Sequence, residues 1–573
     1  MTRARWSGPA VAVAVVTIVW LQLPPAAERL TPPPNPLIAR GAIHVHTVRS
    51  DGAGTPERVA GAAHRAGLDF VVLTDHGDAT RPPDPPRYVD GVLLIDAVEI
   101  STTDGHVIAL GLPQAPYRLA GDARDVLEDV HRLGGFGIAA HPDSPKAELQ
   151  WRDWTSPVDG IEWLNVDSEW RDESRIALSR ALLTYWFRPG ETLASLLDRS
   201  SRTFERWDGL AVVRPIVAVA GLDAHARISF AGQTDVDEGR SIGLPSYESS
   251  FRALSQSVVL EGPLGRTAMS ASSDASAVLK AIRAGATFTV IDGLAGPATL
   301  DFHAVVDGQT VRMGESLKTD QPRQFVATVK PSVPGAITTL LRDGHEVATA
   351  SSGEFRLAKG SDDRRVSYRV EVRLPGAPGT PPVPWIVSNP IYVGARSDVL
   401  PEGGRRRSSV HEHPQFDGTL TAWSIERAQT SEGRVEIAAP NGPPALQFNW
   451  RLGGGPPSGQ YAALAVPIRG DSLPAFDEIA VTGSAPRPTR VSVQIRIPQG
   501  SGLRWRRSIY LDETPRTAIV DIGDMRPIEA PPGTALDLSK ADTLLFVVDT
   551  VNAAPGSVGE ISFTDIRWLG PSR

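Results

Sequence analysis

The chain of 573 residues contains no cysteine. This absence excludes disulfide bonds, thiolate metal ligands, cysteine nucleophiles and a lipid-bearing N-terminal cysteine. An excess of basic residues is also lacking, because the formal net charge is −8. Surfaces that bind nucleic acid are normally basic, so we expect no broad nucleic-acid surface.

The N-terminus predicts export. Arg3 and Arg5 precede an apolar stretch from Ala10 to Leu23, and Pro24-Pro25 ends it. A basic start and an apolar stretch of this length are typical of a signal peptide, whereas a membrane span needs about 20 apolar residues. We therefore interpret residues 1–36 as a signal peptide or an uncleaved membrane anchor, followed by a proline-rich spacer. The protein is then periplasmic, extracellular or membrane-anchored.

Residues 37–295 predict an α/β domain. Thr55-Pro56 is a good helix start and Gly67 a good helix end, and the apolar run Phe70–Leu73 follows at once. The same order recurs where a helical pattern leads into Phe136–Ala140. Helix-then-strand repetition indicates a parallel barrel or sheet. A helical insertion at residues 168–208 interrupts it.

The pattern changes at about residue 296. Val366–Leu374 alternates apolar and polar residues, as a half-buried antiparallel strand does. We predict an immunoglobulin-like sandwich over residues 296–394, a polar linker over 395–417 and a jelly-roll, galactose-binding-like domain over 418–573. In the last domain, aromatic side chains could stack on a glycan, but we expect them to fill the core: Trp423, Trp450 and Trp568.

Residues of the metal-binding types follow short apolar runs in the first half of the chain. Ile43 leads into His44, Ala97-Val98 into Glu99, and Ile138–Ala140 into His141. Active sites of α/β barrels collect at the C-terminal ends of strands. The sequence therefore predicts a site for two or three divalent ions, zinc, manganese or iron. The residues in this series are His44, His46, Asp51, Asp75, His76, Glu99, His106, His141, Asp223 and His225.

The spacing of these residues suits hydrolysis at metal ions. His44 and His46 lie two apart, so both imidazoles point to the same side of a strand and can bind one ion. Asp223 and His225 repeat this spacing, and Glu99 has two oxygens with which to bridge two ions. Such ions lower the pKa of a bound water towards about 7 and neutralise the charge on a transferring phosphoryl group.

These motifs together resemble those of the PHP (polymerase and histidinol phosphatase) superfamily of metal-dependent phosphoesterases. The resemblance spans Ala42 to Leu294. It is carried, in chain order, by His44-Val-His46 with Ser50-Asp51-Gly52, Thr74-Asp75-His76, Glu99, Gly105-His106, Ala140-His141-Pro142 and Gly221-Leu-Asp223-Ala-His225.

The resemblance implies a distorted (β/α)7 barrel, followed here by the two β-sandwich domains. It also implies three metal sites. The first would use His44, His46, Glu99 and Asp223, the second Glu99, His106 and His141, and the third Asp51, His76 and His225. Asp75 would orient a ligand histidine, as carboxylates behind metal ligands do.

Three further residues near the motifs are assigned roles. Arg49 and Arg227 flank ligands, and we predict that they clamp a substrate phosphate. Glu162 ends an expected strand, and we predict a structural role for it.

The sequence thus predicts an exported metal-dependent phosphoesterase that attacks a phosphate monoester or small phosphodiester with metal-bound hydroxide. One alternative is a metal-dependent amide or lactone hydrolase on the same barrel. The other is a cell-surface protein whose β domains bind carbohydrate or a partner while the barrel is inactive.

Overall fold

The computed structural model describes residues 13, 16–17 and 19–571, apart from residues 230–240, 307, 318–323, 352, 358–364, 395–409, 439–443, 456–458, 469–475, 499–501, 529–530 and 532–533. The predicted signal peptide or anchor lies partly outside the described residues, and so does most of the predicted linker. Within the described part of the chain, no helix has the length and apolar character that a membrane span requires.

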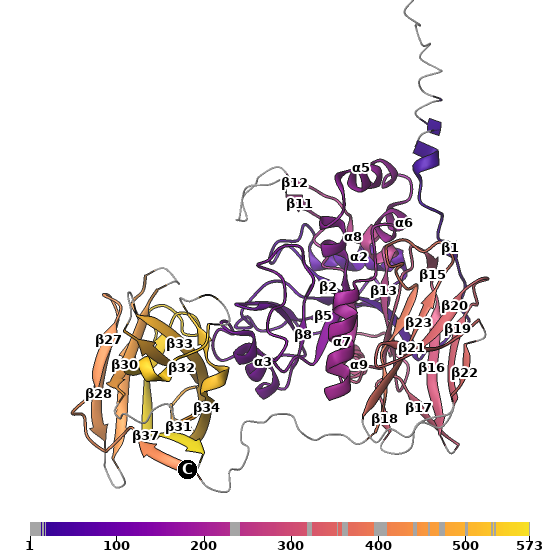
Figure 1. The fold of residues 1–573 in the computed structure, drawn as a ribbon. Coiled ribbons are helices and arrows are strands. Elements are labelled where there is room, and N and C mark those ends of the chain that lie inside the picture. Colours follow the sequence, from indigo (N-terminus) through magenta and orange to yellow (C-terminus); the bar gives the residue numbers. More distant parts are fainter. Residues whose placement is uncertain are drawn as a thin grey trace, which may run out of the picture. The chain divides into compact units, whose positions relative to one another are not determined.

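The chain divides into two compact units. Unit 1 comprises Met1–Gln114 and Asp122–Asp398, and unit 2 comprises Ala115–Gly121 and Val399–Arg573. Helices of four or more residues, within the described ranges, occur in unit 1 only (Figure 1). They are α2 (Pro56–Ala66), α3 (Ala123–Arg132), α4 (Val166–Arg171), α5 (Arg175–Thr184), α6 (Pro189–Ala194), α7 (Ser201–Val213), α8 (Tyr247–Ala253) and α9 (Ala271–Arg283).

Two sheets surround the region of the expected site in unit 1. The smaller has the order β10-β9-β8-β7-β6, and part of the larger has the order β14-β13-β2-β3-β5-β4. Their strands are β2 (Ile38–Val45), β3 (Phe70–Leu73), β4 (Arg87–Val89), β5 (Val92–Asp96), β6 (Val98–Thr102), β7 (Gly105–Leu110), β8 (Phe136–Ala139), β9 (Gly160–Asn165), β10 (Val217–Gly221), β13 (Ser255–Val259) and β14 (Thr287–Val290).

Parallel and antiparallel pairs are mixed in these sheets. The pairs β2-β3, β3-β5, β8-β9 and β9-β10 are parallel, whereas β6-β7, β7-β8 and β2-β13 are antiparallel. Isolated parallel bridges, Val45 to Ala224 and His76 to Glu99, join the two sheets. The pairing therefore places strand ends of both sheets around one region, but it does not show the predicted (β/α)7 barrel.

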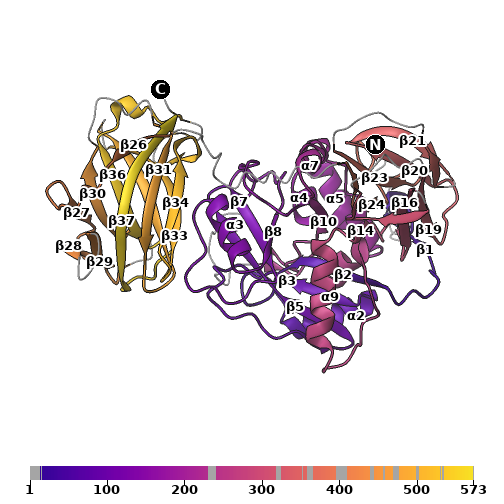
Figure 2. The ribbon, with the colours of Figure 1, turned by 90° about the horizontal axis from the view of Figure 1, so that it is seen from below.

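Local sequence explains the helices beside these strands. The side chain of Thr55 accepts a hydrogen bond from Arg58 N, Pro56 occupies the first helical turn, and Gly67 ends α2 at φ 74°. Figure 2 shows α2 and α9 beside β2, β3 and β5. Val278 and Ile282 of α9 share a core with Phe70 of β3. The strand ends are thus held on a packed core.

The second half of unit 1 is a two-sheet β structure. One sheet has the order β17-β16-β19-β22, and the other continues the large sheet through β24, β23, β25 and β18, with β20 and β21 attached. These strands are β16 (Thr299–Val306), β17 (Gln309–Arg312), β18 (Ser316–Leu317), β19 (Gln324–Lys330), β20 (Ile337–Arg342), β21 (His345–Ala350), β22 (Glu354–Arg356), β23 (Val366–Arg373), β24 (Ile386–Ser388) and β25 (Ile391–Val393).

This region has the predicted sandwich character. The ring centroid of Phe325 in β19 lies 6.3 Å from that of Phe302 in β16 and 4.5 Å from that of Tyr368 in β23 of the other sheet. Antiparallel pairing of β14 with β24 makes one sheet run across the predicted boundary at residue 295. The immunoglobulin-like assignment itself stays a prediction.

Unit 2 consists of two sheets of six strands. Their orders are β28-β29-β37-β31-β34 with β26 attached, and β27-β30-β36-β32-β33-β35. The strands are β26 (Val410–Pro414), β27 (Ser424–Arg427), β28 (Glu432–Ala438), β29 (Ala445–Arg451), β30 (Tyr461–Pro467), β31 (Glu478–Ser484), β32 (Thr489–Ile497), β33 (Leu503–Leu511), β34 (Arg516–Asp521), β35 (Arg526–Pro527), β36 (Thr543–Asp549) and β37 (Val558–Pro571).

Side chains from both sheets fill one core in unit 2. Phe546 of β36 packs on Phe563 of β37, with ring centroids 4.8 Å apart. Trp450 and Trp568 are buried in this core, as expected for core residues. Strand β26 lies within the segment predicted as a linker, so that segment is partly structured. The jelly-roll assignment stays a prediction.

Candidate metal centre

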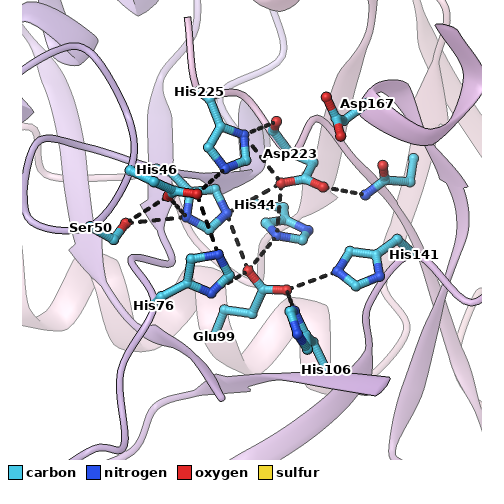
Figure 3. A network of polar contacts seen from close by, with 12 residues as sticks. His44, His46, Ser50, His76, Glu99, His106, His141, Asp167, Asp223 and His225 are labelled. Atoms are coloured by element: carbon cyan, nitrogen blue, oxygen red, sulfur yellow. Dashed lines mark hydrogen bonds and ion pairs between the residues drawn. The ribbon is translucent and has the colours of Figure 1, made fainter. Parts of the chain in front are cut away.

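All nine predicted ligands come together at one end of the two joined sheets (Figure 3). His44 lies in β2, Glu99 in β6 and His106 in β7, whereas the others lie in loops that follow strands. Their ligand atoms form four overlapping groups: His46, Asp51, His76 and His225; His44, Glu99 and His141; His44, His46 and Asp223; and His76, Glu99 and His106.

Glu99 lies at the centre of this arrangement. Its Oε2 is 3.1 Å from His44 Nε2, 3.2 Å from His46 Nε2 and 3.3 Å from His76 Nδ1. Its Oε1 is 2.8 Å from His106 Nδ1 and 2.9 Å from His141 Nε2. One carboxylate thus faces five imidazoles with its two oxygens, which is the geometry that a bridging ligand requires.

Two more carboxylates lie on either side of His46. Asp223 Oδ1 is 3.2 Å from His46 Nε2 and 3.3 Å from His44 Nε2. Asp51 Oδ2 is 3.1 Å from His225 Nε2 and 3.6 Å from His76 Nε2. Each of these carboxylate oxygens therefore lies near the ring nitrogens of two histidines.

Three of the ligand residues have left-handed backbone conformations. The φ angles are 67° at His44, 30° at His141 and 48° at Asp223. Residues other than glycine seldom adopt such angles, and they cluster at sites where the fold imposes a side-chain position. The backbone thus carries strain at the positions from which these ligands project.

The carboxylates determine the electrostatics of the centre. Burial alone would lower the pKa of His46, but Asp223 and Glu99 raise it to about 10. Burial alone would raise the pKa of Glu99, but His44, His106 and His141 hold it well below its ordinary value. Burial alone would also raise the pKa of Asp223, but His44, His46 and His225 hold it well below its ordinary value. The buried carboxylates therefore require positive charge beside them, from protonated imidazoles or from cations.

The donor set fits divalent cations. His46 Nε2 is buried and makes no hydrogen bond of good geometry, although two carboxylate oxygens lie 3.2 Å away. A buried nitrogen that points at two oxygens without bonding to them suits coordination of an ion between them. Imidazole together with carboxylate is the ligand chemistry of zinc, manganese and iron.

Glu162 and Asn165 of β9 extend the centre beyond the predicted ligands. Glu162 Oε1 lies 2.7 Å from His44 Nδ1, and its Oε2 accepts hydrogen bonds from His141 N at 2.6 Å and Asn165 Nδ2 at 2.9 Å. Glu162 therefore orients two ligand histidines, a role that the resemblance assigned to Asp75. The prediction that Glu162 ends a strand is wrong, because Glu162 lies inside β9, and its carboxylate contacts two ligand histidines.

Asp75 lies beside the centre with other partners. Its carboxylate accepts hydrogen bonds from Thr47 N, Thr47 Oγ1 and Ser50 Oγ, each at 2.7 Å. It therefore fixes the turn between His46 and Asp51, and the expected hydrogen bond to a histidine is replaced by these contacts.

Of the two predicted arginines, Arg49 lies at the edge of the centre. Arg49 pairs with Asp84 and with Asp96, and it lines a small cavity of about 160 Å³ together with Asp75 and His76. Arg227 Nε is buried without a hydrogen-bond partner among the described residues. On the other side, His141, Glu162 and Asn165 line a cavity of about 380 Å³.

No protein-family model matches this chain, and a search of curated proteins finds no match. Among solved structures, the chain is similar to the family 11 carbohydrate-binding module of the cellulosomal cellulase Lic26A-Cel5E of Clostridium thermocellum. The two share 16% sequence identity over 28% of this chain and 96% of that chain, with a TM-score of 0.24.

Two further solved structures show comparable likeness. An exo-β-agarase shares 14% identity over 28% of this chain and 26% of its own, with a TM-score of 0.21. A family 29 carbohydrate-binding module shares 14% identity over 29% of this chain and 91% of its own, with a TM-score of 0.19. At these scores the likeness supports no conclusion about ligand or activity, and the resemblance to the PHP superfamily stays a prediction.

Proposed function

We propose that unit 1 is an exported, metal-dependent hydrolase of the PHP type, on a distorted barrel, that cleaves a phosphate monoester or a small phosphodiester. The observation that carries this proposal is that the nine predicted ligands gather in four groups that share members, with Glu99 in two of them. Groups that share ligands hold ions close together. Divalent ions in such a site supply Lewis acidity, a lowered water pKa and neutralisation of phosphoryl charge.

Different residues of the chain would bind the ions, position the ligands and bind the substrate. Imidazoles and carboxylates would hold two or three ions, and Glu162 would keep the ring of His44 in one tautomer through the 2.7 Å contact at Nδ1. Asp75 would fix the turn that precedes Asp51 through its hydrogen bonds from Thr47 and Ser50. Arg49 and Arg227 would bind the phosphate oxygens of the substrate.

Phosphate release tests this function. The full chain, purified without chelator and supplied with Mn²⁺, would be assayed on nucleotides, sugar phosphates and small phosphodiesters. We expect turnover that His44→Ala abolishes and that His64→Ala, which changes an exposed histidine of α2, leaves unchanged. Metal content per chain and circular dichroism would be measured for each variant, so that loss of metal is separated from loss of fold.

The same assay separates the alternative hydrolase. If a chain that holds metal releases amine or acid from an amide or lactone panel but no phosphate from the phosphoester panel, the phosphoesterase proposal is wrong. The amide or lactone hydrolase would then take its place.

A binding role for unit 2 is the second candidate. Among the described residues, every group of side chains that could hold a metal lies in unit 1. The described residues of unit 2 therefore form two packed sheets without a candidate metal-binding group, which favours recognition over metal-dependent chemistry there. Trp450 and Trp568 are buried and cannot stack on a sugar, whereas Trp423 packs against the core and is only partly buried. Retardation of the full chain in gels containing soluble glycans would test this role.

A further inference from the structure

A group of large apolar side chains is exposed on and just after α5. The exposed fractions are 84% for Ile176, 60% for Leu182, 69% for Trp186 and 62% for Phe187, and Leu183 is exposed as well. Leu182 and Trp186 are four residues apart, as are Leu183 and Phe187. We call these five residues the α5 patch. Several large apolar side chains exposed within twelve residues of one another suggest an interaction site, whereas single exposed apolar residues do not.

The α5 patch lies next to the apolar N-terminal stretch. Arg180 Nε donates a hydrogen bond to Gln22 O at 3.0 Å, and Arg188 donates one to Pro24 O. Of the described apolar residues before Gln22, Trp20 is 69% exposed and Leu21 is 66% exposed. Figure 1 shows α5 at the same end of unit 1 as the described part of this stretch. Two apolar exposed segments therefore share one end of the unit.

The charges around the α5 patch favour a lipid surface over a protein. Arg175, Arg180 and Arg188 interrupt the apolar residues, and no acidic residue occurs between Arg175 and Gly190. Helices that lie in a membrane interface combine leucine and aromatic residues on one face with arginine or lysine beside them. Tryptophan prefers the headgroup level, and arginine pairs with anionic headgroups.

We propose that the α5 patch is a membrane-contact surface, which inserts Leu182, Trp186 and their neighbours into the headgroup region of an anionic bilayer. This inference is independent of the proposed hydrolase activity. The same bilayer would contact both the apolar N-terminal stretch and α5.

Hydrogen bonds fix the α5 patch relative to the metal centre. The hydroxyl of Tyr185, directly after α5, lies 2.7 Å from Ser249 Oγ and accepts a hydrogen bond from Ser246 N at 2.8 Å. In the same helix, α8, Tyr247 donates a hydrogen bond to His46 O at 2.8 Å. A bilayer in contact with α5 would therefore hold the metal centre at a constant height above the lipid.

The absence of cysteine allows a site-specific test. Leu182→Cys in the full chain would be labelled with an environment-sensitive fluorophore and mixed with phosphatidylcholine vesicles containing phosphatidylglycerol and a spin-labelled quencher lipid. Met269→Cys, at a residue 98% exposed elsewhere in unit 1, is the matched control. We expect the label at residue 182 to shift to the blue and lose about half or more of its emission, as for a group inside the headgroup boundary. The label at residue 269 should not change.

Two results would overturn the proposal. The first is that the chain binds vesicles, as flotation would show, while the label at residue 182 stays unquenched. The N-terminal stretch alone would then bind the bilayer. The second is a blue shift that needs no vesicles and grows with protein concentration, because a second copy would then cover α5. As a further check, Arg175→Glu should weaken quenching at residue 182 in anionic vesicles more than in neutral ones.

Discussion

Glu162 determines where two ligand histidines point, although it is itself absent from the four ligand groups. One oxygen faces His44 Nδ1, and the other accepts the backbone N–H of His141 and the amide of Asn165. A carboxylate behind a metal-binding histidine fixes the tautomer and raises the basicity of the ring.

We expect Glu162→Gln to lower metal affinity by about 10- to 100-fold, because the amide keeps the shape of the side chain and removes its charge. Metal retained per chain after dialysis against a graded series of buffered Mn²⁺ concentrations measures the loss. Glu205→Gln, at an exposed glutamate of α7, is the control and should bind metal as the unaltered chain does. If the two variants bind Mn²⁺ with equal affinity, Glu162 does not support metal binding.

Gly221 cannot be replaced by a larger residue, because Glu162 occupies the space in which a side chain would lie. A Cβ built on Gly221 would lie 1.7 Å from Glu162 Oε1, so any side chain there must displace the carboxylate. We expect Gly221→Ala to reproduce the metal-binding defect of Glu162→Gln, with an added loss of stability of about 1–3 kcal/mol from overpacking. Combining the two substitutions should give a metal affinity close to that of either alone. Additive losses would mean that Gly221 acts elsewhere.

The contrast between the ligands and Glu162 shows what the sequence could predict at this scale. His44, Glu99 and Asp223 follow apolar runs, so the pattern of a strand end was enough to predict them as metal ligands. Glu162 lies inside such a run, between Ile161 and Trp163. From the sequence alone, a carboxylate there could serve either packing or chemistry, and only the position of His44 Nδ1 decides between them.

At the scale of elements, continuous apolar runs were reliable guides. The predicted strand Phe70–Leu73 agrees with β3 to the residue, and Phe136–Ala140 agrees with β8 to within one residue, because both strands are buried along their length. Val366–Leu374 was correct as a strand but wrong as a half-buried one, since seven of the eight residues of β23 are buried. Its polar face carries Arg369 and Glu371, and α7 packs against it.

The polar face of β23 is buried because its charges are paired. Glu371 accepts hydrogen bonds from Arg199 at 2.8 Å and 3.0 Å, from Arg369 at 3.2 Å and from Arg373 at 2.7 Å, and Arg369 also pairs with Asp208 of α7. An alternating pattern reveals two faces of different polarity. It does not reveal that ion pairs cover the second face, because the partners come from distant parts of the chain.

We expect Glu371→Gln to destabilise unit 1 by about 3–5 kcal/mol near neutral pH, since it leaves buried arginines without their shared partner. Burial alone would raise the pKa of Glu371, but Arg199, Arg369 and Arg373 lower it to about 2 in the folded chain, against 4.5 ordinarily. A lowered folded-state pKa stabilises the fold above pH 4.5, and this contribution is lost as the pH falls towards 2.

Urea unfolding of the unaltered chain and of Glu371→Gln, at pH values from 6 down to 3, measures both effects. The difference in unfolding free energy between the two chains should shrink as the pH falls through this window. Other carboxylates titrate in both chains and therefore cancel in the difference. A difference that stays constant with pH would show that Glu371 is not the carboxylate responsible.

At the scale of the whole molecule, the sequence predicted successive domains, and the structure arranges the described residues of unit 1 differently. A change of pattern near residue 296 suggested a boundary, yet β14 pairs with β24, so the large sheet runs through both regions. Strand edges pair through backbone atoms, which leave no trace in side-chain patterning. Unit 2, by contrast, has a core of its own, so the separation into two units rests on cores rather than on composition.

Because the candidate metal centre belongs to unit 1 and unit 2 has a separate core, removal of metal should affect one unit only. We expect two transitions in differential scanning calorimetry of the full chain, with a chelator lowering the midpoint of one and leaving the other in place. Ions at about 100 times their dissociation constant stabilise the fold that binds them by about 2.7 kcal/mol, which sets the scale of the shift. Glu162→Gln should lower the same transition even without chelator, and this identifies it as unit 1. If the chelator moves both transitions together, the units unfold as one, and metal binding then stabilises the whole chain.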